Sequence, residues 1–196
     1  NVGVDIDTIY VVVKRNINGS DVYLVELFDD EIFVDCAKTG GAASSVNMDH
    51  LEAETVQIIR DGIVEPTQVV PSSPYTITFA QAATSSYQVG LNFETELKTL
   101  PVEPRLESGS LRGFKKRIFE VNAEVYETQS MTIGGKEIAF RRLDGSILDS
   151  AVPEFTGIKT LHGILGYTYE GQITIGQSVP LKMTVLGIDY KLSAGQ

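Results

Sequence analysis

The 196-residue sequence contains no tryptophan, one cysteine and two histidines. A single cysteine, Cys36, excludes an internal disulfide framework and a zinc site built from several cysteines. It fits a protein assembled in a reducing compartment, where a free cysteine most often behaves as a small buried hydrophobic residue. The sequence therefore offers few of the cysteine and histidine side chains that bind transition metals.

The chain also lacks long apolar runs and an excess of basic residues. No segment approaches the roughly 20 apolar residues that span a bilayer as a helix, so we expect no membrane span. Acids outnumber bases 26 to 16, giving a net charge of -10, and this disfavours a general nucleic-acid binder, which needs clustered Lys and Arg. Because the chain begins at Asn1 without a methionine, we interpret it as a piece or a processed product of a longer protein.

What the sequence does contain is β-strand signals. Ile9–Val13 and Val22–Phe28 are runs of β-branched, aromatic and aliphatic residues, and Asn18–Gly19 between them favours a tight hairpin turn. Asp61–Gly62 predicts a second hairpin within residues 49–66. A two-stranded hairpin is not stable alone in water, so the first one needs neighbours.

These signals predict an all-β protein with four parts. Residues 1–46 are expected to form a β-hairpin and a strand that end an upstream β domain. Residues 47–101 are expected to form a small β-barrel of the SH3-like or half-domain type, since apolar and polar residues alternate there. Residues 102–114 hold prolines and glycines without periodicity and predict a linker, and residues 115–196 predict a second antiparallel β-sandwich or barrel.

The candidates for chemistry are weak. His50 and Cys36 are close enough in sequence for a cysteine–histidine pair to be imagined, but His50 can equally pack at the start of the barrel. His162 has no second ligand at metal-binding spacing. We therefore predict no catalytic residues, no cofactor and no metal site.

Five segments in order along the chain carry a family resemblance. They are YVVVKRNING, DHLEAETVQIIRDG, VGL followed by TLPVE, SGSLRGFKKRI and MTVLGI. Together they resemble the C-terminal half of a protein of short-tailed bacteriophages and prophages that is called a tail nozzle, tail tubular or stabilisation protein. In that family the DHLE segment is likened to the small barrel half-domain of ubiquitin-activating enzymes, in fold only. Ala53 departs from the glycine expected there, and the family's propeller-like N-terminal region is absent.

The resemblance implies a structural protein of the virion, not an enzyme. It implies a ring of identical subunits, a hexamer by family resemblance, at the distal end of the portal. The ring would form part of the tail tube, meet the portal or adaptor and other tail proteins, and pass genomic DNA without specific binding. It implies a location in the virion tail after assembly in the host cytoplasm.

Two groups of charged residues follow as site hypotheses. An acidic lumen would avoid retaining DNA phosphates, so we expect acids to face the channel. The candidates are Asp29, Asp30 and Glu31, or Asp49, Glu52 and Glu54. The basic residues Arg112, Lys115, Lys116 and Arg117 are candidates for pairing with an acidic patch on the adjacent subunit.

The alternative function is a glycan- or partner-binding β module of a tail or receptor-binding component, which needs an exposed aromatic patch. The candidate aromatic residues are Tyr75, Tyr87, Tyr167 and Tyr169. Alternation along their strands places Tyr75 and Tyr87 in cores. A hydrolase that uses the Glu94 and Glu96 carboxylates is a third hypothesis, although both side chains are expected to be solvated.

Overall fold

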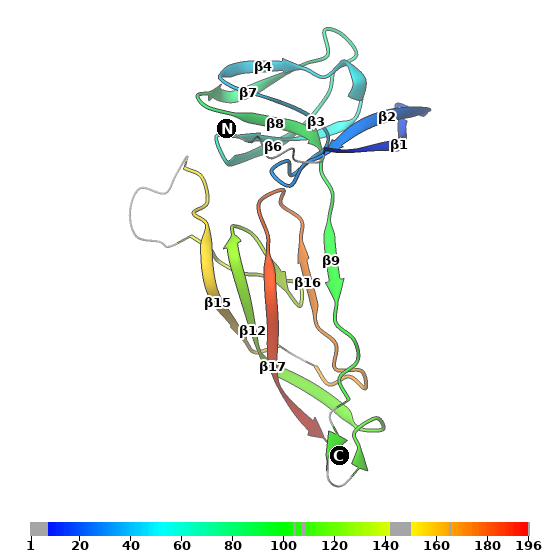
Figure 1. Ribbon diagram of the computed structural model, residues 1–196, viewed down its shortest axis with the longest axis vertical. Helices are drawn as coiled ribbons and strands as arrows, with labels where there is room; N and C mark the ends of the chain where they lie inside the picture. The colour runs from blue at the N-terminus through cyan, green and yellow to red at the C-terminus, as the bar shows by residue number, and fades with distance from the viewer. Residues whose placement is uncertain (1–7, 104, 107–108, 142–149, 165, 196) are drawn as a thin grey trace, which may run out of the picture. The chain divides into compact units, whose positions relative to one another are not determined.

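The computed structural model describes residues 8–103, 105–106, 109–141, 150–164 and 166–195 (Figure 1). Within these ranges the protein is all-β, as the sequence predicts, with a single-turn 3-10 helix, η1 (Asp49–Leu51), and no α-helix. The strands are β1 (Ile9–Ile17), β2 (Ser20–Phe28), β3 (Asp35–Gly40), β4 (Ala43–Asn47), β5 (Thr55–Arg60), β6 (Ile63–Val69), β7 (Thr76–Ala83), β8 (Tyr87–Leu91), β9 (Thr95–Lys98), β10 (Arg105–Leu106), β11 (Gly109–Ser110), β12 (Lys115–Thr128), β13 (Thr132–Ile133), β14 (Lys136–Glu137), β15 (Phe155–His162), β16 (Thr174–Gln177) and β17 (Val185–Gly195).

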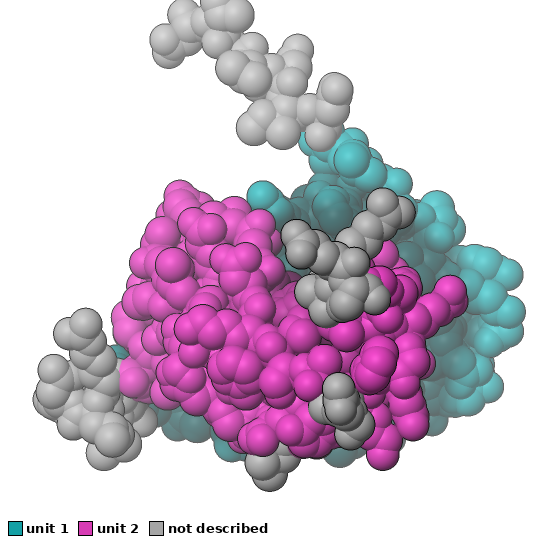
Figure 2. Space-filling view, turned by 90° about the horizontal axis from the view of Figure 1, so that it is seen from below, with its two compact units in different colours: residues 1–93, 149–151 teal, residues 94–148, 152–196 magenta. Residues whose placement is uncertain are grey.

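The chain divides into two compact units, which Figure 2 colours separately. Unit 1 comprises residues 1–93 and 149–151, and unit 2 comprises residues 94–148 and 152–196. Each unit has its own apolar core. In unit 1 the largest fully buried side chains include Met48, Leu51 and Ile58, whereas in unit 2 they include Met131 and Ile133.

Unit 1 contains three antiparallel sheets around its core. They are the hairpin β1–β2, the four-stranded sheet β3-β8-β5-β6 and the pair β4–β7. The helix η1 directs Leu51 into the core. Figure 1 shows β1 and β2 reaching away from the other strands of the unit.

Both predicted hairpins of unit 1 are present, and both turn on an Asx–Gly pair. Asn18 and Gly19 have φ angles of 46° and 77°, and Asp61 and Gly62 have φ angles of 49° and 74°. Two positive φ angles in succession match the right-handed twist of paired strands, and Asn, Asp and Gly tolerate them best. The local sequence therefore determines where these hairpins turn.

Unit 2 contains the sheets β15-β12-β17 and β14-β13-β16-β9 and the short pair β10–β11. The long strand β12 buries Val121, Ala123 and Val125 completely, while the residues between them point outward. Ile133 and Ile175 of the four-stranded sheet belong to the same core. The unit is therefore sandwich-like, with side chains of both sheets filling its interior.

The small barrel expected over residues 47–101 is not formed. Among the described residues no sheet closes, because the order β3-β8-β5-β6 is open at both ends and β7 pairs with β4. The pairs β3–β8 and β4–β7 cross the boundary expected at residue 46, so the first strands share one core with the hairpin β5–β6. Strand β9, also inside the expected barrel, pairs with β16 of unit 2.

The expected linker at 102–114 lies within unit 2. Its residues 104 and 107–108 are outside the described ranges. Val102 is buried, and its N–H donates to the Glu170 carbonyl at 2.9 Å.

Among the described residues, no helix has the length and hydrophobicity that a membrane span requires.

Candidate functional site

The hairpin β1–β2 presents an apolar surface to solvent. Its register pairs Tyr10 with Leu27 and Val12 with Val25, so these side chains share one face with Tyr23. We call these five residues the outer face. Each is between 45% and 71% exposed. Large apolar side chains gathered in this way on a monomer's surface mark an interaction site more often than scattered ones do.

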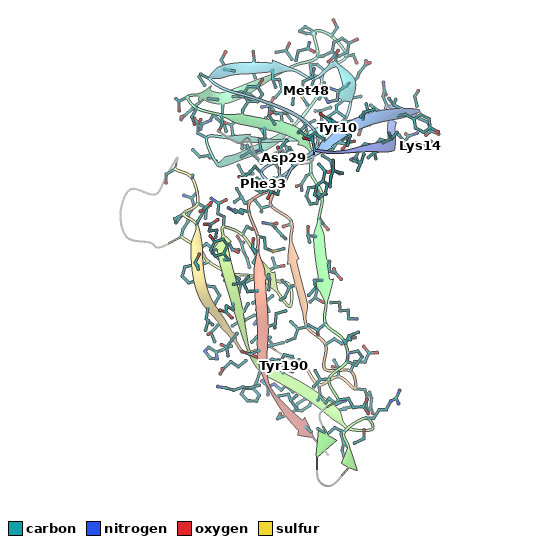
Figure 3. The ribbon with its side chains drawn as sticks, in the orientation of Figure 1. Tyr10, Lys14, Asp29, Phe33, Met48 and Tyr190 are labelled. Carbon is teal, nitrogen blue, oxygen red and sulfur yellow. The ribbon has the colours of Figure 1, made fainter. Side chains whose placement is uncertain are left out.

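The polar residues near the turn neutralise one another. Lys14 Nζ lies 2.6 Å from Asp21 Oδ2, and Asn16 Nδ2 donates to Asp21 Oδ1 at 3.2 Å. The Lys14 ammonium holds the pKa of Asp21 below its usual value. Figure 3 labels Tyr10 and Lys14 on the same strand of the hairpin. The outer face and its polar end therefore carry no net charge, in a chain whose net charge is -10.

The opposite face of the hairpin covers the core of unit 1 and a charged cluster. Ile17 is buried, and Val22 and Leu24 pack against the same core. Arg15 forms a bidentate pair with Glu26, with Nε at 3.0 Å from Oε1 and Nη2 at 3.1 Å from Oε2. Its Nη2 also lies 3.0 Å from Asp35 Oδ2. This bidentate geometry ties β1 to β2 and β1 to the start of β3.

Cys36 and His50 lie beside this cluster but do not form a nucleophile–base pair. The thiol donates to Glu26 Oε1 at 3.3 Å, and His50 Nε2 lies 2.8 Å from the Cys36 carbonyl oxygen. Burial, and secondly the hydrogen bond to Glu26, raise the pKa of the Cys36 thiol to about 12. A thiol held protonated in this way is a poor nucleophile. The fold therefore brings Cys36 and His50 together, but the imidazole contacts the cysteine's carbonyl oxygen and the thiol contacts Glu26. This is not the geometry of a catalytic pair.

A cavity of about 500 Å³ lies beneath the hairpin. The inner face of β1 and β2 forms one side, and the segment that follows β2 and the start of β3 form another. Its apolar walls include Val13, Leu24, Phe28 and Phe93, and its charged lining consists of Arg15, Glu26, Asp29 and Asp35. Cys36 and His50 also line it. The cavity thus combines apolar walls with a predominantly acidic lining.

The two acidic groups predicted from the sequence lie in different environments. Asp29, Asp30 and Glu31 are all exposed in the turn after β2. Asp49 Oδ1 lies 2.7 Å from Lys38 Nζ, which lowers the pKa of Asp49, and Glu54 accepts a hydrogen bond from the Asn18 N–H at 2.9 Å. Glu52 is half-buried. The turn after β2 is therefore the more open of the two groups.

The four predicted basic residues do not form one surface. Arg112 and Lys115 are exposed, but Lys116 is buried and its Nζ donates to the Tyr169 carbonyl at 2.7 Å. Arg117 is half-buried, and its Nε has no hydrogen-bond partner among the described residues. Alternation along β12 explains the difference, since Lys116 points inward like Ile118.

The four predicted aromatic residues also differ in burial and do not form one surface. Tyr75 and Tyr87 are half-buried against the core of unit 1, whereas Tyr167 and Tyr169 are exposed in unit 2. Lys115 Nζ lies 5.8 Å from the Tyr169 ring centre, and the Arg117 guanidinium lies 6.0 Å from that of Tyr167. Both distances are within the range of cation–π contacts.

No cluster in the described ranges has the composition of a metal site, that is, three or more His, Cys, Asp or Glu side chains. His162 Nδ1 has one carboxylate nearby, Glu120 Oε2 at 3.5 Å. Glu94 and Glu96 are exposed, as expected for solvated side chains.

Sequence reasoning did not identify the outer face as a site. The available signal was the run Tyr10–Val13, in which four successive apolar residues make both faces of a strand apolar. Such a run requires cover on both sides, yet Tyr10, Val11 and Val12 are all exposed.

No protein-family model matches the chain, and no curated protein matches it.

Proposed function

We propose that this protein is a structural subunit of a bacteriophage tail, which assembles with identical copies into a ring or tube and uses the hairpin β1–β2 for assembly. The observation that carries the proposal is the outer face, which is apolar, exposed and neutral. A strand face that packs against nothing within its own chain is typical of a surface completed by another chain. The location in a phage tail and the ring of identical subunits are inferred from the family resemblance.

A second copy fits the outer face for an electrostatic reason. Two copies of a chain with a net charge of -10 repel each other at long range, so they approach best where the local charge is zero. The ion pair between Lys14 and Asp21 makes the polar end of the outer face neutral. The apolar side chains then supply the attraction, because their burial removes them from water.

The exposed acids suit a conduit for DNA. Asp30 and Glu31 are exposed next to each other after β2. A wall that carries carboxylates does not bind phosphates and does not retain DNA during ejection. We assign these two residues to the channel wall of the proposed ring. An electron-microscopy map of the ring with both residues on its outer surface would contradict this assignment.

The assembly proposal is tested with the double variant Val12→Asp/Val25→Asp of the full chain. Two carboxylates on the outer face should prevent apolar contact between copies and leave monomers that are still folded. The matched control is Val69→Asp, because Val69 is also a strand residue of unit 1 and is 61% exposed. Mass photometry and negative-stain microscopy should show rings for the wild type and the control and none for the double variant. A wild type that remains monomeric at all concentrations, or a double variant that still forms rings, would contradict the proposal.

A second candidate function is glycan binding through Tyr167 and Tyr169. Both rings are exposed in unit 2, and flat aromatic surfaces of this kind stack on sugar rings. Glycan-array binding that is lost in Tyr167→Ala/Tyr169→Ala, with rings unaffected, would favour this function. Absence of binding on the array would count against it.

A further inference from the structure

The cavity beneath the hairpin and the turn that carries Phe114 have complementary chemistry. We infer that Phe114 of one copy, together with Lys115, docks into the cavity of a second copy. This inference rests on the proposed assembly and names one of its contacts. It joins an acidic, apolar cavity in unit 1 to a basic, aromatic turn in unit 2.

The cavity is suited to an aromatic ring that has a cation beside it. Its volume of about 500 Å³ falls in the range of natural binding pockets. Val11, Val13 and Leu24 give it apolar walls. Its lining holds three carboxylates but one guanidinium, and Arg15 is already paired with Glu26 and Asp35. The remaining carboxylate, Asp29, is exposed and gives the cavity an acidic rim.

His50 also lines the cavity. Its Nε2 faces the Cys36 carbonyl oxygen at 2.8 Å, and because a carbonyl can only accept, Nε2 carries the proton. On the other side of the ring, Nδ1 lies 3.9 Å from Asp49 Oδ1, so His50 also borders a carboxylate. A basic partner therefore suits this lining better than an acidic one.

The turn around Phe114 presents the matching groups. The Phe114 N–H donates to the Leu111 carbonyl at 3.1 Å, which closes a tight turn, and the Phe114 side chain is 42% exposed. Arg112 and Lys115 on either side are exposed. An exposed aromatic ring between two cations has the chemistry of an interface anchor.

The cavity and the turn are different surfaces, so the contact between copies is heterologous. A heterologous contact repeats from each copy to the next and closes into a ring when the rotation allows it. This is the symmetry that the proposed tail ring requires. The contact uses Asp29 between copies and leaves Asp30 and Glu31 for the channel wall.

Phe114→Ala tests the aromatic anchor. Removing the ring should raise the protein concentration needed for half-assembly by roughly 10- to 100-fold, as expected for loss of a buried phenylalanine side chain. The matched control is Phe119→Ala, since Phe119 is 40% exposed and belongs to the adjoining strand β12. The control should assemble like the wild type, as measured by mass photometry across a dilution series.

A charge exchange tests which residues meet. In Asp29→Lys two cations face each other in the contact, and in Lys115→Glu two carboxylates do, so each single variant should raise the half-assembly concentration by about tenfold. The double variant Asp29→Lys/Lys115→Glu restores opposite charges and should assemble at nearly the wild-type concentration. An equimolar mixture of the two single variants should also assemble, because each mixed contact then joins opposite charges.

The outcomes separate this inference from the assembly proposal. Rings that form equally well in Phe114→Ala and Phe119→Ala, or a double charge variant no better than the single ones, would overturn the contact and leave the assembly proposal standing. Failure of the wild type to assemble at any concentration would overturn both. Loss of assembly in Phe114→Ala together with rescue by the charge exchange is the result that we expect.

Discussion

The two hairpins of unit 1 share their local chemistry and differ in their surroundings. Both turn on an Asx–Gly pair with two positive φ angles. Both carry an arginine on the first strand that pairs with a glutamate on the second, Arg15 with Glu26 at 3.0 Å and Arg60 with Glu65 at 2.8 Å. Yet β5 is buried along nearly its whole length, while β1 is exposed over its first four residues.

The difference teaches that turn residues create a hairpin and that its neighbours decide what the hairpin does. Strand β5 is hydrogen-bonded on both edges, to β6 and β8. Among the described residues, β1 pairs with β2 and with no further strand. The inner hairpin therefore stabilises the fold, and the outer hairpin has a face left for another chain.

The largest contrast is expected from truncating one apolar side chain in each hairpin. Ile58 of β5 is fully buried, and Ile58→Ala should lower the free energy of unfolding by about 4 kcal/mol through lost burial and a new cavity. Val12→Ala on the outer face should change it by less than about 0.5 kcal/mol. Urea unfolding at low protein concentration measures both. Equal losses would show that the outer hairpin belongs to the folding core.

The two arginine–glutamate pairs should respond to different degrees. Glu65→Gln leaves the buried Arg60 with Asp61, 3.5 Å away, as its remaining carboxylate. We expect a loss of about 3 kcal/mol, because a buried charge that loses its partner is costly. Glu26→Gln should cost about 1 kcal/mol, since that pair is less buried than Arg60 and Glu65 and the Arg15 guanidinium keeps Asp35 as a partner. A larger loss from Glu26→Gln, in the same urea experiment, would reverse the proposed roles of the hairpins.

Acid should weaken the turn of the second hairpin more than that of the first, where the lowered pKa of Asp21 rests on the exposed ion pair with Lys14. The Asp61 carboxylate accepts hydrogen bonds from the N–H groups of Thr84, Ser85 and Ser86, and these hold its pKa far below the usual value. A lowered pKa in the folded state contributes stability above the unfolded pKa of about 3.9, and this is lost as the pH falls below it. Asp61→Asn should therefore flatten the fall in stability between pH 5 and pH 2, to be measured by thermal unfolding at each pH, with Asp30→Asn as the control.

The smallest expected effect concerns Cys36, which lies under the outer hairpin. Its pKa of about 12 in the fold exceeds that of a free thiol, so the unfolded chain loses its proton first as the pH rises. This contribution to stability is complete below about pH 8.5 and declines from there towards pH 12. A disulfide reagent should modify the thiol slowly at pH 8 and rapidly in urea. Rapid modification of the folded protein would mean that the hairpin opens often.

The sequence predicts what is local in this fold. The pairs Asn18–Gly19 and Asp61–Gly62 place both hairpins, and alternation along β12 places Val121, Ala123 and Val125 in a core. It did not predict that β3 would pair with β8, because that choice depends on residues some fifty positions apart. The barrel prediction failed for this reason, since it assumed that the strands of residues 47–101 would pair only among themselves.

The candidate site residues were also predictable only as far as local sequence patterns determine them. The basic run Lys115–Arg117 predicts one charged surface, but the alternation of a strand buries its middle member, Lys116. The run Ile9–Val13 predicts a strand, whereas the exposure of its apolar side chains is a property of the whole unit. Short-range patterns indicate which way a side chain points, and the remainder of the chain determines what it meets.

Hydrogen exchange at two protein concentrations tests the central claim most directly, because it reads both hairpins in one sample. At low concentration the amides of β1 and β2 should exchange faster than those of β5, since among the described strands β1 pairs with β2 alone and β5 is hydrogen-bonded on both edges. At high concentration the amides of β1 and β2 should become protected by assembly, while those of β5 stay unchanged. Protection of β1 and β2 that is the same at both concentrations would contradict the claim that a second copy completes this surface.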